Sequence, residues 1–178
     1  GSVISVSWVL KKNKVPWLTF ANIIGPLIFL GYAIGRLGCF LVGDDYGIPT
    51  NLPWAISFPN GAPPSTVYYI EKAGYVFSDP ISPSTVCAVH PTQIYEMILY
   101  FIIFIFLRKM LHRKHFDGEI FMNYLFLAGL SRFLVEFIRL NTKYYMNLSG
   151  AQYISIIMML VAIVWHYYYR KNILNGKN

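Results

Sequence analysis

Three charged side chains share one face of an otherwise apolar stretch of this sequence, SRFLVEFIR. Arg132, Glu136 and Arg139 lie at positions i, i+4 and i+7, so a helix would carry all three on one side. An ionised side chain at the centre of a bilayer costs about 2.5 to 3.5 kcal/mol on insertion scales, and guanidinium groups bind phosphate or carboxylate in a bidentate manner. The spacing therefore predicts either an anion site or ion pairs between helices.

Arg36 lies in a second apolar stretch, about two helical turns before a long connecting segment. The glycines around it include Gly31 and Gly35, whose spacing lets helices in lipid approach closely. One hypothesis is that Glu136 bridges Arg36 and Arg132 and simply holds the helices together. The other hypothesis starts from the count of three arginines against this one glutamate, because such a buried surplus favours a bound anion, for example a lipid phosphate.

The segment HPTQIYE, which begins at His90, is the other polar concentration in the chain. Pro91 suits the first helical position, so we expect His90 to be the N-cap, although histidine is a weak one. In the helix that follows, Gln93, Glu96 and Tyr100 would share a face. The spacing alone also fits an ordinary helix start at a membrane interface, so both interpretations stay open at this point.

The elements that must position these groups are apolar helices. Hydrophobic residues make up 56% of the chain and charged residues 13%, and the mean hydropathy is +0.46, a composition typical of membrane proteins. Four apolar runs approach or exceed the roughly 20 residues that cross a bilayer. We expect a single integral membrane domain, 1–178, of the all-α polytopic class, with a partial N-terminal span, a long extracytoplasmic loop at 43–90, and full spans at 17–42, 94–111, 120–138 and 151–169.

The basic residues predict how these spans are oriented, because short loops rich in Lys and Arg stay cytoplasmic. If the four spans alternate, ten of the 15 basic residues fall on one side, and the arginine-bearing ends of the spans face outward. The net charge of +7 is then a signal of topology, and no nucleic-acid partner is expected. The ten residues are Lys11, Lys12, Lys14, Arg108, Lys109, Arg113, Lys114, Arg170, Lys171 and Lys177.

The loop 43–90 is rich in Pro, Gly, Ser and Asn, which is typical of irregular structure. It also carries aromatic residues such as Trp54 and Tyr68, which argue against a free linker. Aromatic rings favour the depth of the membrane interface, so we expect the loop to form a layer that rests there.

Cysteine and histidine are the remaining reactive residues on the expected outer side. Cys39 and Cys87 both fall toward the oxidising compartment, where a disulfide and two free thiols are both open alternatives. His90 is the only histidine expected there, since His112, His115 and His166 lie near the other face, and it is a candidate base for a thiol, whose pKa is ordinarily about 8.5. The sequence contains no glycine-rich phosphate loop and no metal-ligand spacing around the cysteines, so it predicts no cofactor and no metal.

Three motifs in order, GRLGCFLVGDDYGIPTNLPWAISFP, HPTQIYE and SRFLVEFIR, resemble the prolipoprotein diacylglyceryl transferase family, and the resemblance covers nearly the whole chain. Members of that family move the diacylglyceryl group of phosphatidylglycerol to the lipobox cysteine thiol of a prolipoprotein and release glycerol phosphate. The resemblance therefore implies a multi-pass transferase of the bacterial cytoplasmic (inner) membrane whose catalytic side faces outward, with phosphatidylglycerol, a prolipoprotein signal peptide and membrane lipid as partners.

The chemistry of this transfer, together with the matched motifs, suggests roles for residues. We expect Arg36 and Arg132 to contact the lipid phosphate, Glu136 to orient the guanidinium groups, and His90 to be the candidate base. Cys39 and Val42 stand where the family signature G-R-x-G-N-F-x-N-G-E-x-x-G has asparagines, and Asp44 stands where it has glutamate. The residues implied in substrate binding are Arg139, Gly38, Cys39, Asp44, Gly47, Gln93, Tyr95 and Glu96.

Two expectations concern what the resemblance does not cover. The family has further N-terminal spans with an H-G-G segment whose histidine is a proposed base, and this chain begins about where that segment would end. We expect those spans to be supplied in the same chain or by a separate N-terminal fragment. The alternative functions are a non-catalytic paralogue that binds anionic lipid, and a transporter or channel, which would need more polar residues across 97–106 than Tyr100.

Overall fold

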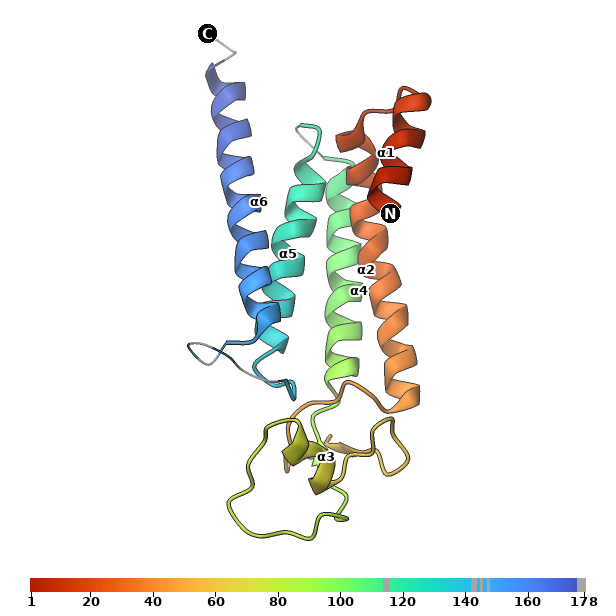
Figure 1. The fold of residues 1–178 in the computed structure, drawn as a ribbon. Coiled ribbons are helices and arrows are strands. Elements are labelled where there is room, and N and C mark those ends of the chain that lie inside the picture. The colour runs from red at the N-terminus through yellow and green to blue at the C-terminus, as the bar shows by residue number, and fades with distance from the viewer. Residues whose placement is uncertain (114–115, 142–143, 145, 147, 176–178) are drawn as a thin grey trace.

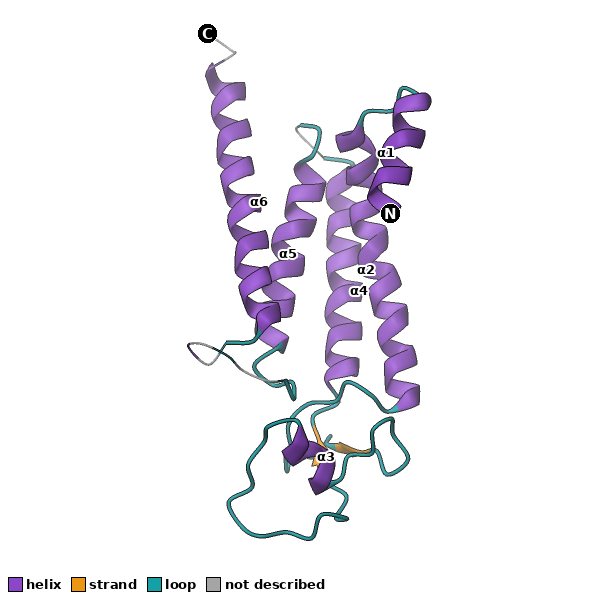
Figure 2. Cartoon of the chain, viewed as in Figure 1, coloured by secondary structure: helices purple, strands orange, loops and turns teal. Residues whose placement is uncertain are grey.

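The structure is a computed structural model that describes residues 1–178 except 114–115, 142–143, 145, 147 and 176–178. It is mostly helical, with long helices side by side and a smaller folded segment at one end (Figures 1 and 2). The long helices are α1 (Ser2–Lys12), α2 (Trp17–Val42), α4 (Thr92–Leu111), α5 (Glu119–Val135) and α6 (Gly150–Asn175). The segment between α2 and α4 contains β1 (Ile56–Ser57), α3 (Val67–Lys72) and β2 (Ala88–Val89).

Two of the described helices are long and apolar enough to cross a membrane. They are α2, with a mean hydropathy of 1.7, and the part of α6 from Gly150 to Tyr169, with 1.5. The other two expected spans, α4 and α5, are helices of 20 and 17 residues, and α5 is shorter than the roughly 20 residues of a full crossing. The fold thus agrees with an all-α membrane protein, whereas the count of four spans stays a prediction.

The helix α2 runs from Trp17 to Val42, which are the bounds expected for the span 17–42. The expected span 120–138 ends earlier, because the helix α5 stops at Val135. The physical reason is a backbone hydrogen bond in which Ile48 N donates to Ile138 O at 2.9 Å, which takes Ile138 out of the helix. The chain after α5 therefore runs across the turn that follows α2.

The expectation that His90 caps α4 is wrong. The helix begins at Thr92 with Pro91 at the N-cap position and no side-chain cap. The backbone of His90 is instead paired with the turn after α2: its N donates to Ile48 O at 3.1 Å, and its O accepts from Gly47 N at 2.9 Å. The residue before a proline favours extended conformations, and here that extended backbone is used for these long-range bonds.

The helices pack as pairs around one apolar core. α2 lies against α4 and α5, α4 lies against α5, and α6 lies along α5. The core between the first three consists of Phe29, Ala33, Tyr100, Ile103, Leu107 and Ile120. α5 and α6 come especially close at Gly129, where an added Cβ would lie 2.7 Å from the carbonyl oxygen of Ser155.

The segment between α2 and α4 has an apolar core of its own, as its aromatic content predicts. Tyr46, Phe58, Ile70 and Val89 form this core, and Tyr46 stacks on Phe58 with ring centroids 5.7 Å apart. The strands β1 and β2 pair antiparallel beside it. The segment is therefore folded and attached to one end of the helices (Figure 1); its position at a membrane interface stays a prediction.

The described basic residues gather at the other end of the helices. Lys11 and Lys12 close α1, Arg108 and Lys109 close α4, and Lys171 lies in the last part of α6. Figure 1 shows these three helix ends at the same end of the molecule, opposite the segment between α2 and α4. The expected one-sided charge thus agrees with the fold for these residues; Lys114, His115 and Lys177 lie outside the described part of the chain.

Candidate anion-binding site

A cluster of arginines and acids lies where the helices meet the folded segment. Arg36 comes from the last turns of α2 and Asp45 from the turn after it. Glu96 comes from the first turns of α4. Arg132 comes from the end of α5, and Arg139 lies in the chain that follows it.

Glu96 is the centre of this cluster. Its side chain is fully buried, and its carboxylate lies 2.7 Å from Nε of Arg36, 3.6 Å from Nη1 of Arg132 and 3.6 Å from Nη1 of Arg139. Tyr100 Oη donates a hydrogen bond to Glu96 Oε1 at 3.1 Å, as their position on one helix face predicts. A buried carboxylate with charged partners and a hydrogen-bond donor is compensated, and here it fixes three guanidinium groups relative to one another.

Asp45 is the second acid, and it joins two arginines. Its Oδ2 lies 2.7 Å from Nη1 of Arg36 and its Oδ1 lies 2.5 Å from Nη2 of Arg139. Burial tends to raise the pKa of Asp45, but the positive charges of Arg139 and Arg36 outweigh it and lower that pKa below the ordinary value of 3.8. Asp45 is therefore ionised at neutral pH.

Glu136 is the third acid. Its carboxylate lies 3.2 Å from Nη2 of Arg132, and its other oxygen accepts a hydrogen bond from Asn141 Nδ2 at 2.7 Å. The described partners of Arg36 are Glu96 and Asp45 instead, so the hypothesis that Glu136 bridges Arg36 and Arg132 is wrong.

The count of three arginines against one glutamate needs the same correction. It left out Asp45 and Glu96, which the fold brings to the arginines from two other elements. With Glu136, three acids face three arginines. The acids that pair with the arginines therefore match them in number, and Asp44 lies beside Asp45 as a further acid, so no buried positive surplus requires an anion.

A cavity of about 420 Å³ lies beside the cluster. One end of it is charged, with Arg36, Arg132, Arg139 and Asp45 in its wall. The remainder of its wall comes from α2, α4, α5 and α6 and is apolar or aromatic apart from two serines: Phe29, Tyr32, Tyr100, Tyr124, Ala128, Ser131, Ala151, Ile154, Ser155 and Met158. A cavity with guanidinium donors at one end and an apolar wall elsewhere suits an amphiphile with an anionic head group.

The other residues expected to bind substrate lie around this cavity and are not among those that line it. Gln93 Nε2 donates to the carbonyl oxygen of Asp44, and Thr92 Oγ1 donates to that of Asp45 at 2.7 Å. Gly47 allows close packing, since an added Cβ would lie 2.5 Å from the carbonyl oxygen of Ile138. These residues hold the backbone that presents Asp45, and Thr92 was not expected from the sequence. Gly38 has open space where a Cβ would be.

His90 takes part in a hydrogen-bonded chain outside the cavity wall. Trp54 Nε1 donates to Tyr95 Oη at 2.7 Å, and Tyr95 Oη lies 3.3 Å from Nδ1 of His90. The imidazole can act as a base only in the tautomer in which Nδ1 donates to Tyr95, because Nε2 is then the free acceptor. The role of His90 as a base stays a prediction, and Tyr95 is positioned to control its tautomer.

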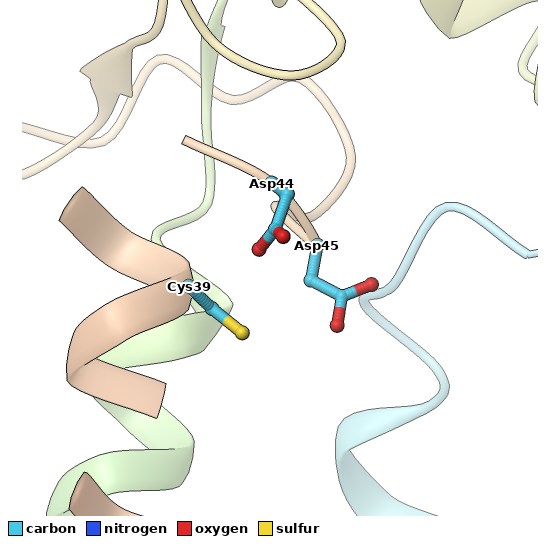
Figure 3. A group of neighbouring side chains, drawn as sticks. All are labelled: Cys39, Asp44 and Asp45. Atoms are coloured by element: carbon cyan, nitrogen blue, oxygen red, sulfur yellow. The ribbon is translucent and has the colours of Figure 1, made fainter. Parts of the chain in front are cut away.

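Cys39 faces the two aspartates of the turn after α2 (Figure 3). Atoms of metal-ligand type from Cys39, Asp44 and Asp45 lie within 4.8 Å of one another. Asp45, however, already contacts two guanidinium groups, whose positive charge opposes a bound cation. The group thus fits an ion-pair cluster better than a metal site.

The two cysteines are both free and half-buried. Of the two alternatives left open by the sequence, the structure has the free thiols. Burial raises the pKa of the Cys87 thiol, which makes it a poor nucleophile at neutral pH.

Comparison with known proteins gives the same family from independent relatives. The family model described as prolipoprotein diacylglyceryl transferase matches residues 1–168. The phosphatidylglycerol–prolipoprotein diacylglyceryl transferase of Finegoldia magna is 33% identical over 99% of this chain and 61% of its own length. Those of Clostridium tetani and Aeromonas salmonicida are 32% and 30% identical, over 92% and 96% of this chain. The chain spans 58% and 56% of the length of these two relatives.

Proposed function

This chain belongs to the prolipoprotein diacylglyceryl transferase family, and from that premise we propose that it takes part in transferring the diacylglyceryl group of phosphatidylglycerol to the lipobox cysteine of a prolipoprotein. The observation that carries the proposal is the cavity whose charged end holds Arg36, Arg132 and Arg139 and whose remaining wall is largely apolar. The charged end suits the lipid phosphate, and the apolar wall suits the beginning of the acyl chains.

The chemistry of the transfer needs a stabilised leaving group. The cysteine sulfur attacks the carbon of the diacylglyceryl unit that bears the phosphate. A C–S bond forms there, and the C–O bond between that carbon and the phosphate breaks. The electron pair of that bond leaves with glycerol phosphate, and the thiol proton goes to a base. Fixed cations in a site with little water stabilise such a leaving phosphate. Arg132 is the best placed of the three for this role, because its ion pairs, at 3.2 and 3.6 Å, are longer than the shortest ones of Arg36 and Arg139.

The acids have a positioning role in this mechanism. Glu96 and Glu136 contact the arginines but do not belong to the cavity wall, so they orient guanidinium groups and do not meet the lipid. His90 is proposed as the base in the tautomer whose Nδ1–H donates to Tyr95 Oη. The proton of the acceptor thiol then passes to Nε2 of His90, so the thiol must approach that atom.

The proposed topology is a multi-pass protein of the bacterial cytoplasmic (inner) membrane, with α2, α4, α5 and α6 as four spans and the site facing outward. Its support is the gathering of described basic residues at the helix ends opposite the folded segment, since such residues stay cytoplasmic. Lys11 and Lys12 would then be inside, and the segment between α2 and α4 outside.

A transfer assay tests the proposal. The purified protein in detergent receives phosphatidylglycerol and a lipobox peptide, and both released glycerol phosphate and the thioether product are measured by mass spectrometry. Arg132→Ala should lower transfer by about 10²- to 10³-fold, the usual effect of losing one group that stabilises a developing charge. Lys72→Ala, which removes an exposed positive charge from the folded segment, is the matched control and should leave transfer unchanged.

The assay includes a second arm because the chain spans 56 to 61% of the length of these relatives. The N-terminal part of a relative is added, either fused in the same chain or as a separate fragment, as the completing partner that we propose. Transfer only with this addition would support completion of the site by N-terminal spans. Equal transfer by the parent and Arg132→Ala in either arm would refute the proposed site.

The second candidate function is a protein that holds anionic lipid without transferring it. The observation that favours it is the absence of His90 from the wall of the cavity as the structure describes it. Such a protein would bind phosphatidylglycerol in the first arm and in the second, and would release no glycerol phosphate in either.

A further inference from the structure

We propose that the Asp45 carboxylate is an internal competitor of the lipid phosphate for Arg36 and Arg139, and that the anionic head group must displace it to bind. The inference rests on the proposed lipid site and adds to it a residue that sets its affinity and helps its product leave.

The geometry of the carboxylate is that of a bridging anion. Each oxygen of Asp45 contacts a different guanidinium group, Oδ2 at 2.7 Å from Arg36 and Oδ1 at 2.5 Å from Arg139. A phosphodiester has two unesterified oxygens that share its negative charge, and guanidinium groups bind such oxygens through the same N–H donors. The carboxylate and a lipid phosphate would therefore use the same two arginines.

Asp45 is also the one acid of the three that is placed to move. Its side chain is 43% exposed and lines the cavity, whereas those of Glu96 and Glu136 are 0% and 2% exposed. Each glutamate is further held by a neutral donor, Glu96 by Tyr100 and Glu136 by Asn141. The described contacts of the Asp45 carboxylate are with arginines, so a stronger anion can exchange for it.

The backbone of Asp45 stays anchored when the side chain moves. Thr92 Oγ1 donates to the Asp45 carbonyl at 2.7 Å, and Gly47 N donates to the carbonyl of His90 at 2.9 Å. Asp45 has a φ of 57°, a left-handed conformation that Asp, Asn and Gly tolerate better than other residues. Displacement therefore needs a side-chain rotation and no rearrangement of the turn.

The charge of the cluster predicts that Asp45 weakens the binding of a phosphate. With Asp45 in place, all three arginines are paired with acids, so an added phosphate meets no positive surplus and finds a carboxylate already bound to two of the guanidinium groups. Once Asp45 turns away, Nη1 of Arg36 and Nη2 of Arg139 are free for the phosphate, while Glu96 still holds both guanidinium groups in place. The same competition acts on glycerol phosphate after transfer, so Asp45 returns to the arginines as the product leaves.

The test measures binding of phosphatidylglycerol in nanodiscs of phosphatidylcholine and of free glycerol phosphate by calorimetry. Asp45→Asn keeps the shape and tolerates the left-handed backbone, but loses the charge. We expect it to bind both ligands about tenfold more tightly than the parent, a change of ~1.4 kcal/mol, and glycerol phosphate to inhibit any transfer at correspondingly lower concentration. Asp45→Gly, which also suits the backbone, should show the same gain if Asp45→Asn folds poorly.

Asp79→Asn is the matched control, because it removes an exposed negative charge from the folded segment; its affinity should equal that of the parent. If the parent binds phosphatidylglycerol and both Asp45 variants bind it equally or more weakly, Asp45 holds the arginines in place and the competitor role is wrong while the lipid site stands. If neither the parent nor the variants bind it, the lipid site itself is wrong, and this inference with it.

Discussion

Replacing Glu96 by glutamine tests whether one carboxylate organises the whole cluster. Glutamine keeps the size of the side chain and the oxygen that accepts from Tyr100, and it removes the charge that faces Arg36, Arg132 and Arg139. Removing one partner of a buried ion pair destabilises proteins by about 3–5 kcal/mol, because the other charge is left uncompensated. Since Asp45 still contacts two of the arginines, we expect the lower end, about 3 kcal/mol.

The assay is thermal unfolding in detergent, followed by intrinsic fluorescence. At a chain length of 178 residues, 1 kcal/mol shifts Tm by roughly 2–4 °C, so Glu96→Gln should lower Tm by about 6–12 °C. Glu71→Gln, an exposed carboxylate on α3, is the matched control and should leave Tm unchanged.

Added phosphatidylglycerol makes the test specific to charge. A phosphate that binds the arginines replaces part of the lost negative charge, so the lipid should raise the Tm of Glu96→Gln by more than that of the parent. An unchanged Tm for Glu96→Gln, equal to that of Glu71→Gln, would refute the central role of Glu96. A lowered Tm without recovery by the lipid would mean that the exposed faces of the arginines do not receive a phosphate.

Two further predictions concern the turn after α2. Gly47→Ala should lower the free energy of unfolding by roughly 1–3 kcal/mol through overpacking, because its Cβ would lie 2.5 Å from Ile138 O. Gly31→Ala is the control, since nothing lies within 4 Å of its added Cβ, and it should not lower that free energy. Equal Tm values for the two variants in thermal unfolding would contradict the close contact at Gly47. The second prediction is pH dependence: since the arginines lower the pKa of Asp45 below 3.8, its stabilising effect is present above that pH and lost as the pH falls through the lower folded value. The Tm difference between the parent and Asp45→Asn should therefore stay constant from neutral pH to about pH 4 and disappear below it; a difference that already falls between pH 7 and 5 would contradict the lowered pKa.

Local spacing predicts the parts of the site that lie within one helix. The pairing of Arg132 with Glu136 and the contact of Tyr100 with Glu96 both follow from helical periodicity, and the apolar run of α2 predicts its bounds. These features need only the geometry of 3.6 residues per turn, which does not depend on how the helices are arranged.

The parts that could not be predicted depend on contacts between distant segments. Asp45 and Arg139 are 94 residues apart in the chain, and neither lies in a pattern that points to the other. The only available signal for Asp45 was a second acid directly after Asp44, in the turn that follows an arginine-bearing helix. The false N-cap at His90 has the same origin, since backbone bonds to Gly47 and Ile48 decide its conformation.

The backbone bonds around Gly47 also determine when the site can form during synthesis. Residues 47–48 form backbone hydrogen bonds with His90 and with Ile138. These bonds connect the end of α2 with the start of α4 and with the end of α5. A nascent chain can bring Glu96 to Arg36 as soon as α4 has formed, but the bond between Ile48 and Ile138 must wait until Ile138 has been synthesised. The arginine cluster is therefore completed late, only after α5 and the residues that follow it have packed against the turn after α2.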